Sequence, residues 1–366
     1  MDLRRARVIR YKMPFRAPYV TAEGIATHRQ GFIVQIEAEY GLVGLGEVSY
    51  LPYEAGGLDT LEASLLSLAE RAAGADMAEF GGGVSVKAES GWPAFAFAMT
   101  DLIARSRGES VASLFPREPA DAVAVNALIG GGPVDEIVVA SALAVAAGYR
   151  SLKLKVGIAA STAEEIERIA AVREEIGPRT GLRLDANGAW TEPEALALMK
   201  VALAYAIEYI EQPVAPGRIA GLKRLRDTKL VPIAADEDVH DLRSAERVLE
   251  TGAADVLVLK PLQFAGLSQA RAIAERATMA GVKAMVTTSI DTGVGTALAL
   301  QLAATLATDD AHGLATLPLL EDDLIVEPGL PVEHGEMRLP DEPGLGVELD
   351  EAAVDKYATA QWSFEA

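Results

Sequence analysis

Five charged side chains each stand at the end of a short apolar segment, and they recur at nearly equal intervals. They are Lys155, Asp185, Glu211, Asp236 and Lys260, and neighbours in this series are 24 to 30 residues apart. That interval fits one strand, one helix and two loops. In a barrel of parallel strands, functional side chains come from the strand ends at one mouth. The repeat therefore predicts that two lysines and three carboxylates meet at one point.

The three carboxylates predict a metal site. Asp185, Glu211 and Asp236 each close an apolar strand, where an unpaired carboxylate is costly to desolvate unless a cation compensates its charge. Ligands that are all oxygen suit a hard ion, so we expect Mg²⁺, with Mn²⁺ able to substitute. Strand alternation turns Glu237 away from Asp236, which favours Asp236 as the ligand. Any one of these acids by itself could instead be a helix N-cap or a solvated loop residue.

The positions of the lysines predict that a substrate would have a lysine side chain on each of its two faces. Lys153 and Lys155 are two residues apart and share the inward face of one strand, whereas Lys260 ends the sixth strand across the ring. A lysine that acts as a base near pH 7 needs its pKa lowered by about 3 units from roughly 10.4, and we expect Lys153 and the metal to lower the pKa of Lys155. This arrangement suits removal of a proton next to a carboxylate, because a divalent ion and an ammonium both stabilise the second negative charge that develops.

The elements that position these charges fall into two patterns. Residues 3–13 and 31–48 are predicted antiparallel strands, the second with a turn at Tyr40 and Gly41, and residues 58–106 are predicted to be helical. From Val123 onward, short apolar strands alternate with amphipathic helices, which is typical of right-handed βαβ units. The predicted strands are 123–129, 151–156, 181–186, 207–211, 231–236, 255–260, 284–288 and 313–317. Thr191 and Glu194 predict a capping box at the start of one helix.

These patterns predict an α/β fold: a modified TIM-type (β/α)7β barrel with an N-terminal α+β capping domain that the C-terminal segment completes. A barrel of about 250 residues leaves roughly a hundred of the 366 for a second unit. We expect the capping domain at 1–120, the barrel with the active site at 121–325, and a Pro- and Gly-rich segment at 326–366 that returns to the capping domain.

Composition excludes several classes of function. The formal net charge of −20 disfavours a nucleic-acid or anionic-membrane partner, although a small anionic carboxylate can bind where cations concentrate. There is no cysteine, so thiolate metal sites, disulfides and cysteine nucleophiles are excluded. The N-terminus lacks the apolar core of a signal peptide, and no apolar run is long enough to span a bilayer. We expect a cytoplasmic enzyme and leave open whether it forms a homo-oligomer.

The spacing of these motifs resembles that of a known family. Lys153-x-Lys155, Asp185-x-Asn187, Glu211-Gln212-Pro213, Asp236-Glu237 and Lys260-Pro261 are similar in order and spacing to the enolase superfamily, in its muconate-lactonizing subgroup. The resemblance covers nearly the whole chain. It implies a capping domain that closes over the barrel, three acids that bind Mg²⁺, and Lys155 and Lys260 on either side of the substrate.

Finer segments resemble the o-succinylbenzoate synthases of menaquinone biosynthesis; they are 125–130, 287–293, 312–316 and 322–324. The resemblance implies syn dehydration of 2-succinyl-6-hydroxy-2,4-cyclohexadiene-1-carboxylate. Lys155 would remove the proton and assist departure of the hydroxyl from the same face, while Lys260 stays an ammonium over the enediolate. Ser289 and Gly313 would hold the substrate carboxylates, and Asn187 is also an expected substrate-binding residue. Residues 14–21 correspond to a mobile loop with Gly24 as a hinge, where Arg16 either meets a substrate carboxylate or lies on the surface.

Other reactions use the same ring of charges. A dipeptide epimerase needs the same metal and both lysines, but such enzymes typically carry an Asp-x-Asp pair on the eighth strand, where this chain has Gly313-Leu314-Ala315. That difference counts against a substrate with a free ammonium group. An N-acylamino acid racemase needs no acid to bind an ammonium group, so this activity is retained as an alternative. Cycloisomerisation of a muconate is a further alternative. A barrel without catalytic activity, whose acids bind a structural ion, is the alternative from a different class.

Overall fold

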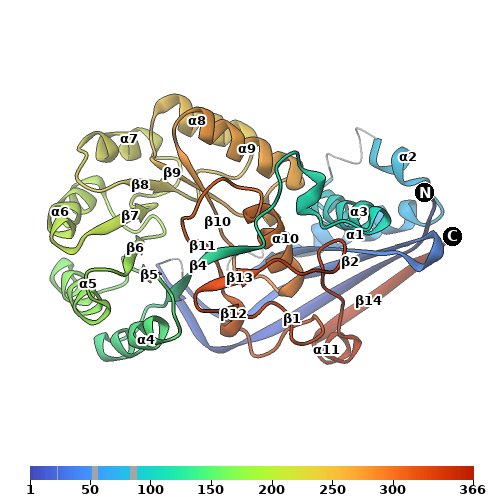
Figure 1. Cartoon of the computed structure of the whole chain (residues 1–366), viewed down its shortest axis with the longest axis horizontal. Coiled ribbons are helices and arrows are strands. Elements are labelled where there is room, and N and C mark those ends of the chain that lie inside the picture. The colour runs from blue at the N-terminus through green and yellow to red at the C-terminus, as the bar shows by residue number, and fades with distance from the viewer. Residues whose placement is uncertain (23, 52–56, 83–88) are drawn as a thin grey trace.

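Two sheets organise the chain, and the structure describes residues 1–22, 24–51, 57–82 and 89–366 (Figure 1). In this computed structural model, one sheet is antiparallel with the strand order β14-β1-β2-β3, and the other forms a barrel of parallel strands. Figure 1 shows the antiparallel sheet and its helices beside the barrel, with both chain ends at the far edge of that sheet. This arrangement confirms the predicted fold class.

The antiparallel sheet joins the two ends of the chain. It consists of β1 (Leu3–Thr21), β2 (Gly24–Ala38), β3 (Val43–Tyr50) and β14 (Ala358–Glu365), and β14 pairs with β1 from the end of the chain inward. The predicted turn is present as a short 3-10 segment in which Tyr40 has φ 65° and Gly41 has φ 73°. The C-terminal segment therefore completes the capping unit, as predicted, while the residue boundaries 1–120, 121–325 and 326–366 stay predictions.

Helices cover one side of this sheet. They are α1 (Leu58–Ala72), α2 (Met77–Gly82) and α3 (Trp92–Arg107), which bury Leu65, Leu68 and Phe95 against the strands. Gly44 and Gly46 of β3 let α3 approach closely, because a Cβ at either position would collide with backbone oxygens of that helix.

The predicted loop at 14–21 is instead part of a strand. Strand β1 continues to Thr21, and Tyr19, Val20 and Thr21 pair with the start of β2, with a register shift between Pro14 and Tyr19. The long hairpin carries its tip from the antiparallel sheet to the mouth of the barrel. Gly24 is the first residue of β2 and has φ 152°, a backbone conformation that favours glycine.

The barrel contains the eight predicted parallel strands, each within two residues of its predicted bounds. They are β4 (Ala122–Ile129), β5 (Ser151–Lys155), β6 (Gly181–Asp185), β7 (Ile207–Glu211), β8 (Ile233–Ala235), β9 (Val256–Leu259), β10 (Lys283–Val286) and β11 (His312–Ala315). Neighbouring strands pair in sequence order, β11 pairs with β4, and a bridge from Thr287 to Gly313 joins the last two strands. The ring is therefore closed.

Seven helices surround the strands. They are α4 (Val134–Ala146), α5 (Thr162–Ile176), α6 (Glu192–Ala202), α7 (Ile219–Asp227), α8 (Leu242–Thr251), α9 (Leu267–Met279) and α10 (Gly293–Ala303). The predicted capping box starts α6, because Glu194 accepts hydrogen bonds from the backbone N–H and the hydroxyl of Thr191.

The remaining elements are short. They are the 3-10 turns at Ala112–Leu114, Leu203–Tyr205, Pro261–Gln263 and Leu317–Leu319, strands β12 (Val332–Glu333) and β13 (Glu336–Arg338), and helix α11 (Glu351–Tyr357). Strand β13 pairs antiparallel with β4, outside the ring of parallel strands. None of the helices in the described part of the chain has the length and apolar character that crossing a membrane requires.

Helix α10 is buried on all sides because it lies between the barrel and the capping sheet. Glu47 of β3 reaches its first turn and accepts hydrogen bonds from the hydroxyl of Thr292 at 2.6 Å and the N–H of Gly295 at 2.7 Å. The hydroxyl of Tyr11 also donates to Glu47, at 2.6 Å. A carboxylate at a helix N-terminus satisfies free N–H groups and the helix dipole. The capping sheet is thus anchored to the barrel by polar contacts as well as apolar packing.

His312 makes the stability of the barrel sensitive to acid. Its side chain is buried in β11, and its Nδ1 accepts a hydrogen bond from the backbone N–H of Val286 at 3.0 Å. Burial, assisted by Arg183, lowers the pKa of His312 from 6.5 to about 4. The unfolded chain therefore takes up the proton first as pH falls, so folding stability is lost between about pH 6.5 and pH 4, by about 2 kcal/mol at pH 5.

Denaturant unfolding at pH 7.5 and pH 5 measures this loss. We expect the wild-type protein to lose about 2 kcal/mol more than His312→Gln between the two pH values, because glutamine does not titrate. His334→Gln, at an exposed histidine, is the matched control and should behave as wild type. Equal losses in wild type and His312→Gln would show that His312 does not cause the effect.

Candidate active site

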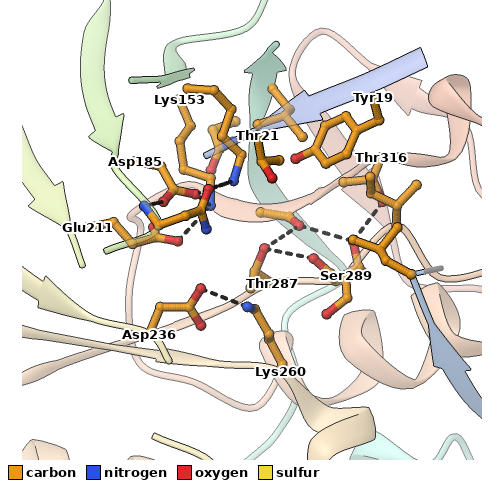
Figure 2. A pocket seen from close by; sticks show the side chains of 18 residues that line it. Tyr19, Thr21, Lys153, Asp185, Glu211, Asp236, Lys260, Thr287, Ser289 and Thr316 are labelled. Carbon is orange, nitrogen blue, oxygen red and sulfur yellow. Dashed lines mark hydrogen bonds and ion pairs between the residues drawn. The ribbon is translucent and has the colours of Figure 1, made fainter. Parts of the chain in front are cut away.

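One pocket at the carboxyl ends of the barrel strands collects nine of the ten predicted site residues (Figure 2). It is lined by Tyr19, Thr21, Leu51, Asn126, Leu128, Lys153, Lys155, Asp185, Asn187, Glu211, Asp236, Lys260, Thr287, Thr288, Ser289, Ile290, Gly313 and Thr316. The barrel strands and the loops after them provide most of this wall. The hairpin tip of the capping sheet provides Tyr19 and Thr21, which lie above Glu211, Asp236 and Lys260 in Figure 2.

Sheet register places the first three charges side by side. Lys155 is the partner of Asp185 in the β5–β6 pair, and Asp185 is the partner of Glu211 in the β6–β7 pair. Leu152 and Leu154 alternate with the lysines and are buried against the surrounding helices. The period of two along β5 is therefore what aims both Lys153 and Lys155 into the barrel.

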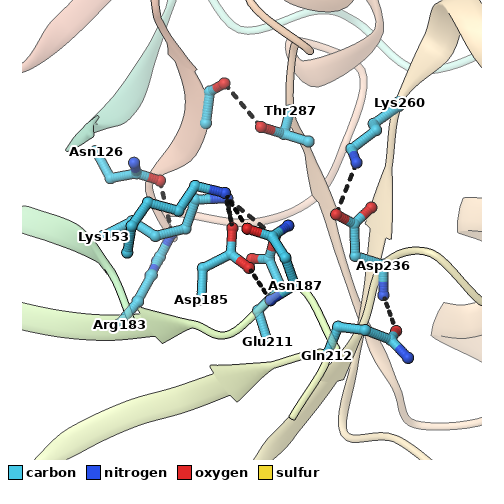
Figure 3. A network of polar contacts seen from close by, with 12 residues as sticks. Asn126, Lys153, Arg183, Asp185, Asn187, Glu211, Gln212, Asp236, Lys260 and Thr287 are labelled. Carbon is cyan, nitrogen blue, oxygen red and sulfur yellow. Dashed lines mark hydrogen bonds and ion pairs between the residues drawn. The ribbon is translucent and has the colours of Figure 1, made fainter. Parts of the chain in front are cut away.

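The lysines form ion pairs with the carboxylates (Figure 3). Lys155 Nζ lies 2.7 Å from Asp185 Oδ2, and Lys153 Nζ lies 2.9 Å from Glu211 Oε1 and 3.3 Å from Asp185 Oδ2. Lys260 Nζ lies 2.7 Å from Asp236 Oδ2 and on the side of the pocket opposite Lys153. The ammonium groups thus compensate the buried carboxylates, and the two predicted substrate-facing lysines come from opposite walls.

The expected lowering of the pKa of Lys155 counted the bound metal as well as Lys153, and it stays a prediction for the metal-bound site. Burial lowers the pKa of its ammonium, and Lys153 acts in the same direction. With the protein groups alone, the Asp185 carboxylate at 2.7 Å and Tyr19 act in the opposite direction, and together they hold the pKa of Lys155 above its ordinary value. The sequence pattern identifies the neighbouring lysine, but it does not show how closely a carboxylate approaches.

One carboxylate oxygen of Glu211 has no hydrogen-bond partner among the described residues. Burial and the nearby Asp185 raise the pKa of Glu211 to about 8, and its Oε2 atom is buried without a hydrogen-bond partner. In the described ranges, no three Asp, Glu or His side chains lie close enough as they stand to hold one ion, and Lys153 lies between two of the acids, Asp185 and Glu211. Even so, three buried carboxylates at successive strand ends, one with an unpartnered oxygen, fit a hard divalent cation.

Glu237 does not line the pocket, but its side chain contacts a residue that does. Its Oε1 accepts a hydrogen bond at 2.9 Å from the side-chain amide of Asn187, whose Oδ1 accepts one at 2.7 Å from Lys155 Nζ. Strand β8 ends at Ala235, so its alternation does not extend to residues 236 and 237. Asp236 lines the pocket and Glu237 does not, which leaves Asp236 as the preferred ligand.

Arg16 is the predicted site residue that the structure does not bring to the pocket. It is exposed within β1, in the stretch between Pro14 and Tyr19 that does not pair with β2. The same strand instead contributes Tyr19, whose ring centroid lies 6.0 Å from Lys155 Nζ. A role for Arg16 in binding a substrate carboxylate has no support from this position.

Sequence reasoning missed several polar residues of the pocket wall, among them Asn126, Thr288 and Thr316. Asn126 accepts a hydrogen bond from Arg183, and Thr288 and Thr316 share a hydrogen bond of 2.7 Å. A polar residue inside an otherwise apolar strand is the signal that could have identified Asn126. The threonines lie at or beyond strand ends, where the strand period gives no direction for a side chain.

Comparison with known proteins identifies the family. The family model for enolase C-terminal domain-like proteins matches residues 137–353, more than half of the chain. The chain belongs to the enolase superfamily. This membership agrees with the ring of charges at the strand ends and with the closed barrel, and it makes the chain a member of a superfamily of enzymes.

Relatives within the superfamily carry out different reactions. The chain is 29% identical over 362 residues to a chloromuconate cycloisomerase of Cupriavidus pinatubonensis. This match covers 95% of this chain and 96% of the relative. It is 36% identical over 223 residues to an o-succinylbenzoate synthase of Thermobifida fusca, covering 60% of this chain and 68% of the relative. A solved dipeptide epimerase of Enterococcus faecalis, complexed with Mg and the dipeptide L-Leu-L-Tyr, superposes with a TM-score of 0.87 at 26% identity, covering 95% of this chain and all of that one.

Proposed function

We propose that this enzyme dehydrates 2-succinyl-6-hydroxy-2,4-cyclohexadiene-1-carboxylate to o-succinylbenzoate, a step of menaquinone biosynthesis. The observation that carries the proposal is the acid content of the pocket. In the part of the chain that the structure describes, the lining includes no carboxylate besides Asp185, Glu211 and Asp236. Strand β11 contributes Gly313 where a dipeptide epimerase would present an acid. The pocket thus lacks a group to bind a substrate ammonium and suits a substrate with carboxylates only.

Gly313 also has a steric role at this position. A Cβ there would collide with the hydroxyl of Thr287, and the bridge between Thr287 and Gly313 closes the barrel. The packing of the last two strands therefore requires a glycine at position 313 of β11.

Lys155 and Lys260 divide the chemistry between two faces of the substrate. The Lys155 amine takes the proton from the carbon next to the carboxylate, and the electron pair of that C–H bond moves into the enediolate. As the enediolate collapses, the C–O bond to the hydroxyl breaks on the same face, and Lys155 returns the proton so that water leaves. Lys260 stays protonated on the opposite face and stabilises the enediolate charge. The product gains an aromatic ring, and Lys155 ends as a neutral amine.

Asp185, Glu211 and Asp236 would hold a divalent cation, which we propose to be Mg²⁺. When bound, such a cation supplies Lewis-acid stabilisation of the negative charge that develops on the substrate carboxylate. Asn187 holds Lys155 from one side and contacts Glu237 from the other, so we propose that it orients the base instead of binding substrate. Ser289 and Gly313 remain the proposed contacts for the substrate carboxylates.

A spectrophotometric assay tests this function directly. Purified enzyme with Mg²⁺ and the cyclohexadiene acid should produce o-succinylbenzoate, which is detected by the ultraviolet change on aromatisation. Parallel reactions with an alanyl dipeptide, an N-succinylamino acid and a muconate, each followed by proton exchange in D₂O or by product formation, cover the alternative reactions. Rapid epimerisation of the dipeptide or lactonisation of the muconate, without turnover of the cyclohexadiene acid, would contradict the proposal.

A further inference from the structure

Ile290 has an unusual backbone conformation in the wall of the pocket. Its φ is 63°, in the left-handed region that β-branched residues rarely adopt, and its side chain is buried. It directly follows Ser289, and both residues line the pocket. Strained residues of this kind persist where the surrounding structure holds them in place, and they cluster at functional sites. The contacts that hold this turn therefore bear on how the pocket works.

Asp291 holds the turn from one side. Its Oδ2 accepts a hydrogen bond at 3.2 Å from the backbone N–H of Ser289, the residue before Ile290. Asp291 therefore fixes the backbone on the N-terminal side of Ile290. The carboxylate is almost fully buried, with 2% of its residue surface exposed. A short-range bond from a side chain to the backbone two residues earlier is typical of a structured turn.

The other oxygen of Asp291 is bound by the capping sheet. Oδ1 accepts a hydrogen bond at 2.7 Å from the hydroxyl of Ser49 in β3, and Arg29 Nη2 of β2 lies 3.4 Å from the same oxygen. Arg29 also donates to the Ser49 hydroxyl at 2.8 Å. These partners are separated from Asp291 by more than 240 residues of chain. The turn in the barrel is thus held by residues of the capping unit.

The turn presents a hydroxyl that has no hydrogen bond of its own. Thr287 Oγ1 donates to the carbonyl of Gly313, and the Thr288 hydroxyl is paired with that of Thr316. Across residues 1–22, 24–51, 57–82 and 89–366, no hydrogen bond involves the Ser289 hydroxyl, which lies partly buried in the pocket lining. Ser289 is therefore the hydroxyl of this segment that is left to bind a substrate.

We propose that Asp291 is a positioning residue that uses Ser49 and Arg29 of the capping sheet to hold the Ser289–Ile290 turn in its left-handed conformation, and that this turn sets which substrates fit. Docking of the capping sheet then completes the substrate site as well as covering it. The inference rests on the proposed function for the substrate used in the kinetic test below. The contacts themselves are independent of the reaction.

Two variants and a matched control separate this role from simple attachment of the capping sheet. Ser49→Ala removes the hydroxyl that bonds Asp291, and Asp291→Asn removes the charge that Arg29 and Ser49 face. Tyr11→Phe removes a buried hydroxyl from the same interface, but that hydroxyl donates to Glu47 and does not contact Asp291. If the contacts only attach the two units, all three variants should behave alike.

Amide hydrogen exchange in the full-length protein, with Mg²⁺ and without substrate, is the first measurement. We expect peptides covering residues 287–290 to exchange at least about ten-fold faster in Ser49→Ala than in wild type, and to exchange as wild type in Tyr11→Phe. Exchange within two-fold of wild type in both Ser49→Ala and Asp291→Asn, or equal acceleration in Tyr11→Phe, would overturn the proposal. If Asp291→Asn does not fold, Ser49→Ala alone decides the outcome.

Steady-state kinetics with the cyclohexadiene acid is the second measurement. We expect Ser49→Ala to raise KM by about ten-fold with a much smaller change in kcat, Ser49→Thr to restore KM, and Tyr11→Phe to leave KM unchanged. An unchanged KM in Ser49→Ala would overturn the substrate-selecting role of the turn. If wild type itself does not convert the cyclohexadiene acid, the proposed function fails while the exchange measurement still tests the positioning role.

Discussion

Replacing Lys155 by alanine is expected to lower kcat for dehydration by about 10⁴-fold or more, because the group that removes the proton is lost. Lys153 does not replace it, since its Nζ already contacts Glu211 and Asp185. The two lysines also differ in their surroundings, because the Asn187 side chain contacts Lys155. Turnover of the variant is measured by the ultraviolet assay, and exchange of the substrate proton is followed in D₂O.

A loss of activity must be separated from a loss of folding. Removing a buried lysine leaves the Asp185 carboxylate without its closest cation, which can cost about 3–5 kcal/mol. Lys155→Arg keeps the positive charge but cannot give up its proton near neutral pH, so we expect it to fold better and to stay inactive. Lys229→Ala, at an exposed lysine away from the pocket, should retain activity. Near-normal turnover in a folded Lys155→Ala protein would end the assignment of Lys155 as the base.

Removal of divalent metal is expected to abolish turnover, and addition of Mg²⁺ is expected to restore it. The proposed ligands are Asp185, Glu211 and Asp236, and the unpartnered buried oxygen of Glu211 is the observation that fits a cation ligand best. Glu211→Gln keeps the size of the side chain but removes its charge. We expect this variant to bind Mg²⁺ at least about 10²-fold more weakly, as measured by calorimetric titration.

The same titration provides a test that does not depend on the substrate. Saturating Mg²⁺ should raise the thermal midpoint of the wild-type protein, because an ion that binds only the folded state stabilises it. Glu208→Gln is a matched control, since Glu208 lies on the same strand β7, pairs with Arg183 and does not line the pocket. Full activity after exhaustive chelation, or equal Mg²⁺ affinity in Glu211→Gln and wild type, would contradict a metal site formed by the three acids.

Much of the barrel and its charged ring could be predicted from the sequence because the signals are local. Short apolar runs separated by helical patterns gave all eight strands, and the last residue of β5, β6 and β7 is the charged residue of the repeat. Parallel strand ends meet at one mouth, so spacing along the chain carries over to position in space. The capping box of α6 is equally local, since it depends on Thr191 and Glu194 alone.

Positions set by contacts between distant parts of the chain could not be predicted in this way. The path of β1 to Thr21 depends on pairing with β2, so the segment taken for a loop is a hairpin that brings Tyr19 and not Arg16 to the pocket. The contact of Glu237 with Asn187 depends on the loop that follows β8.

By itself, then, the sequence determined the barrel, its order of strands and the identity of the charges at the mouth, because each follows from a periodic pattern within a few residues. The tertiary structure alone decided the pairing of Lys155 with Asp185 and the attachment of the Ser289–Ile290 turn to Ser49 of the capping sheet. Distances between side chains and the electrostatic balance of a buried cluster depend on how separate elements pack, and neither is encoded in local periodicity.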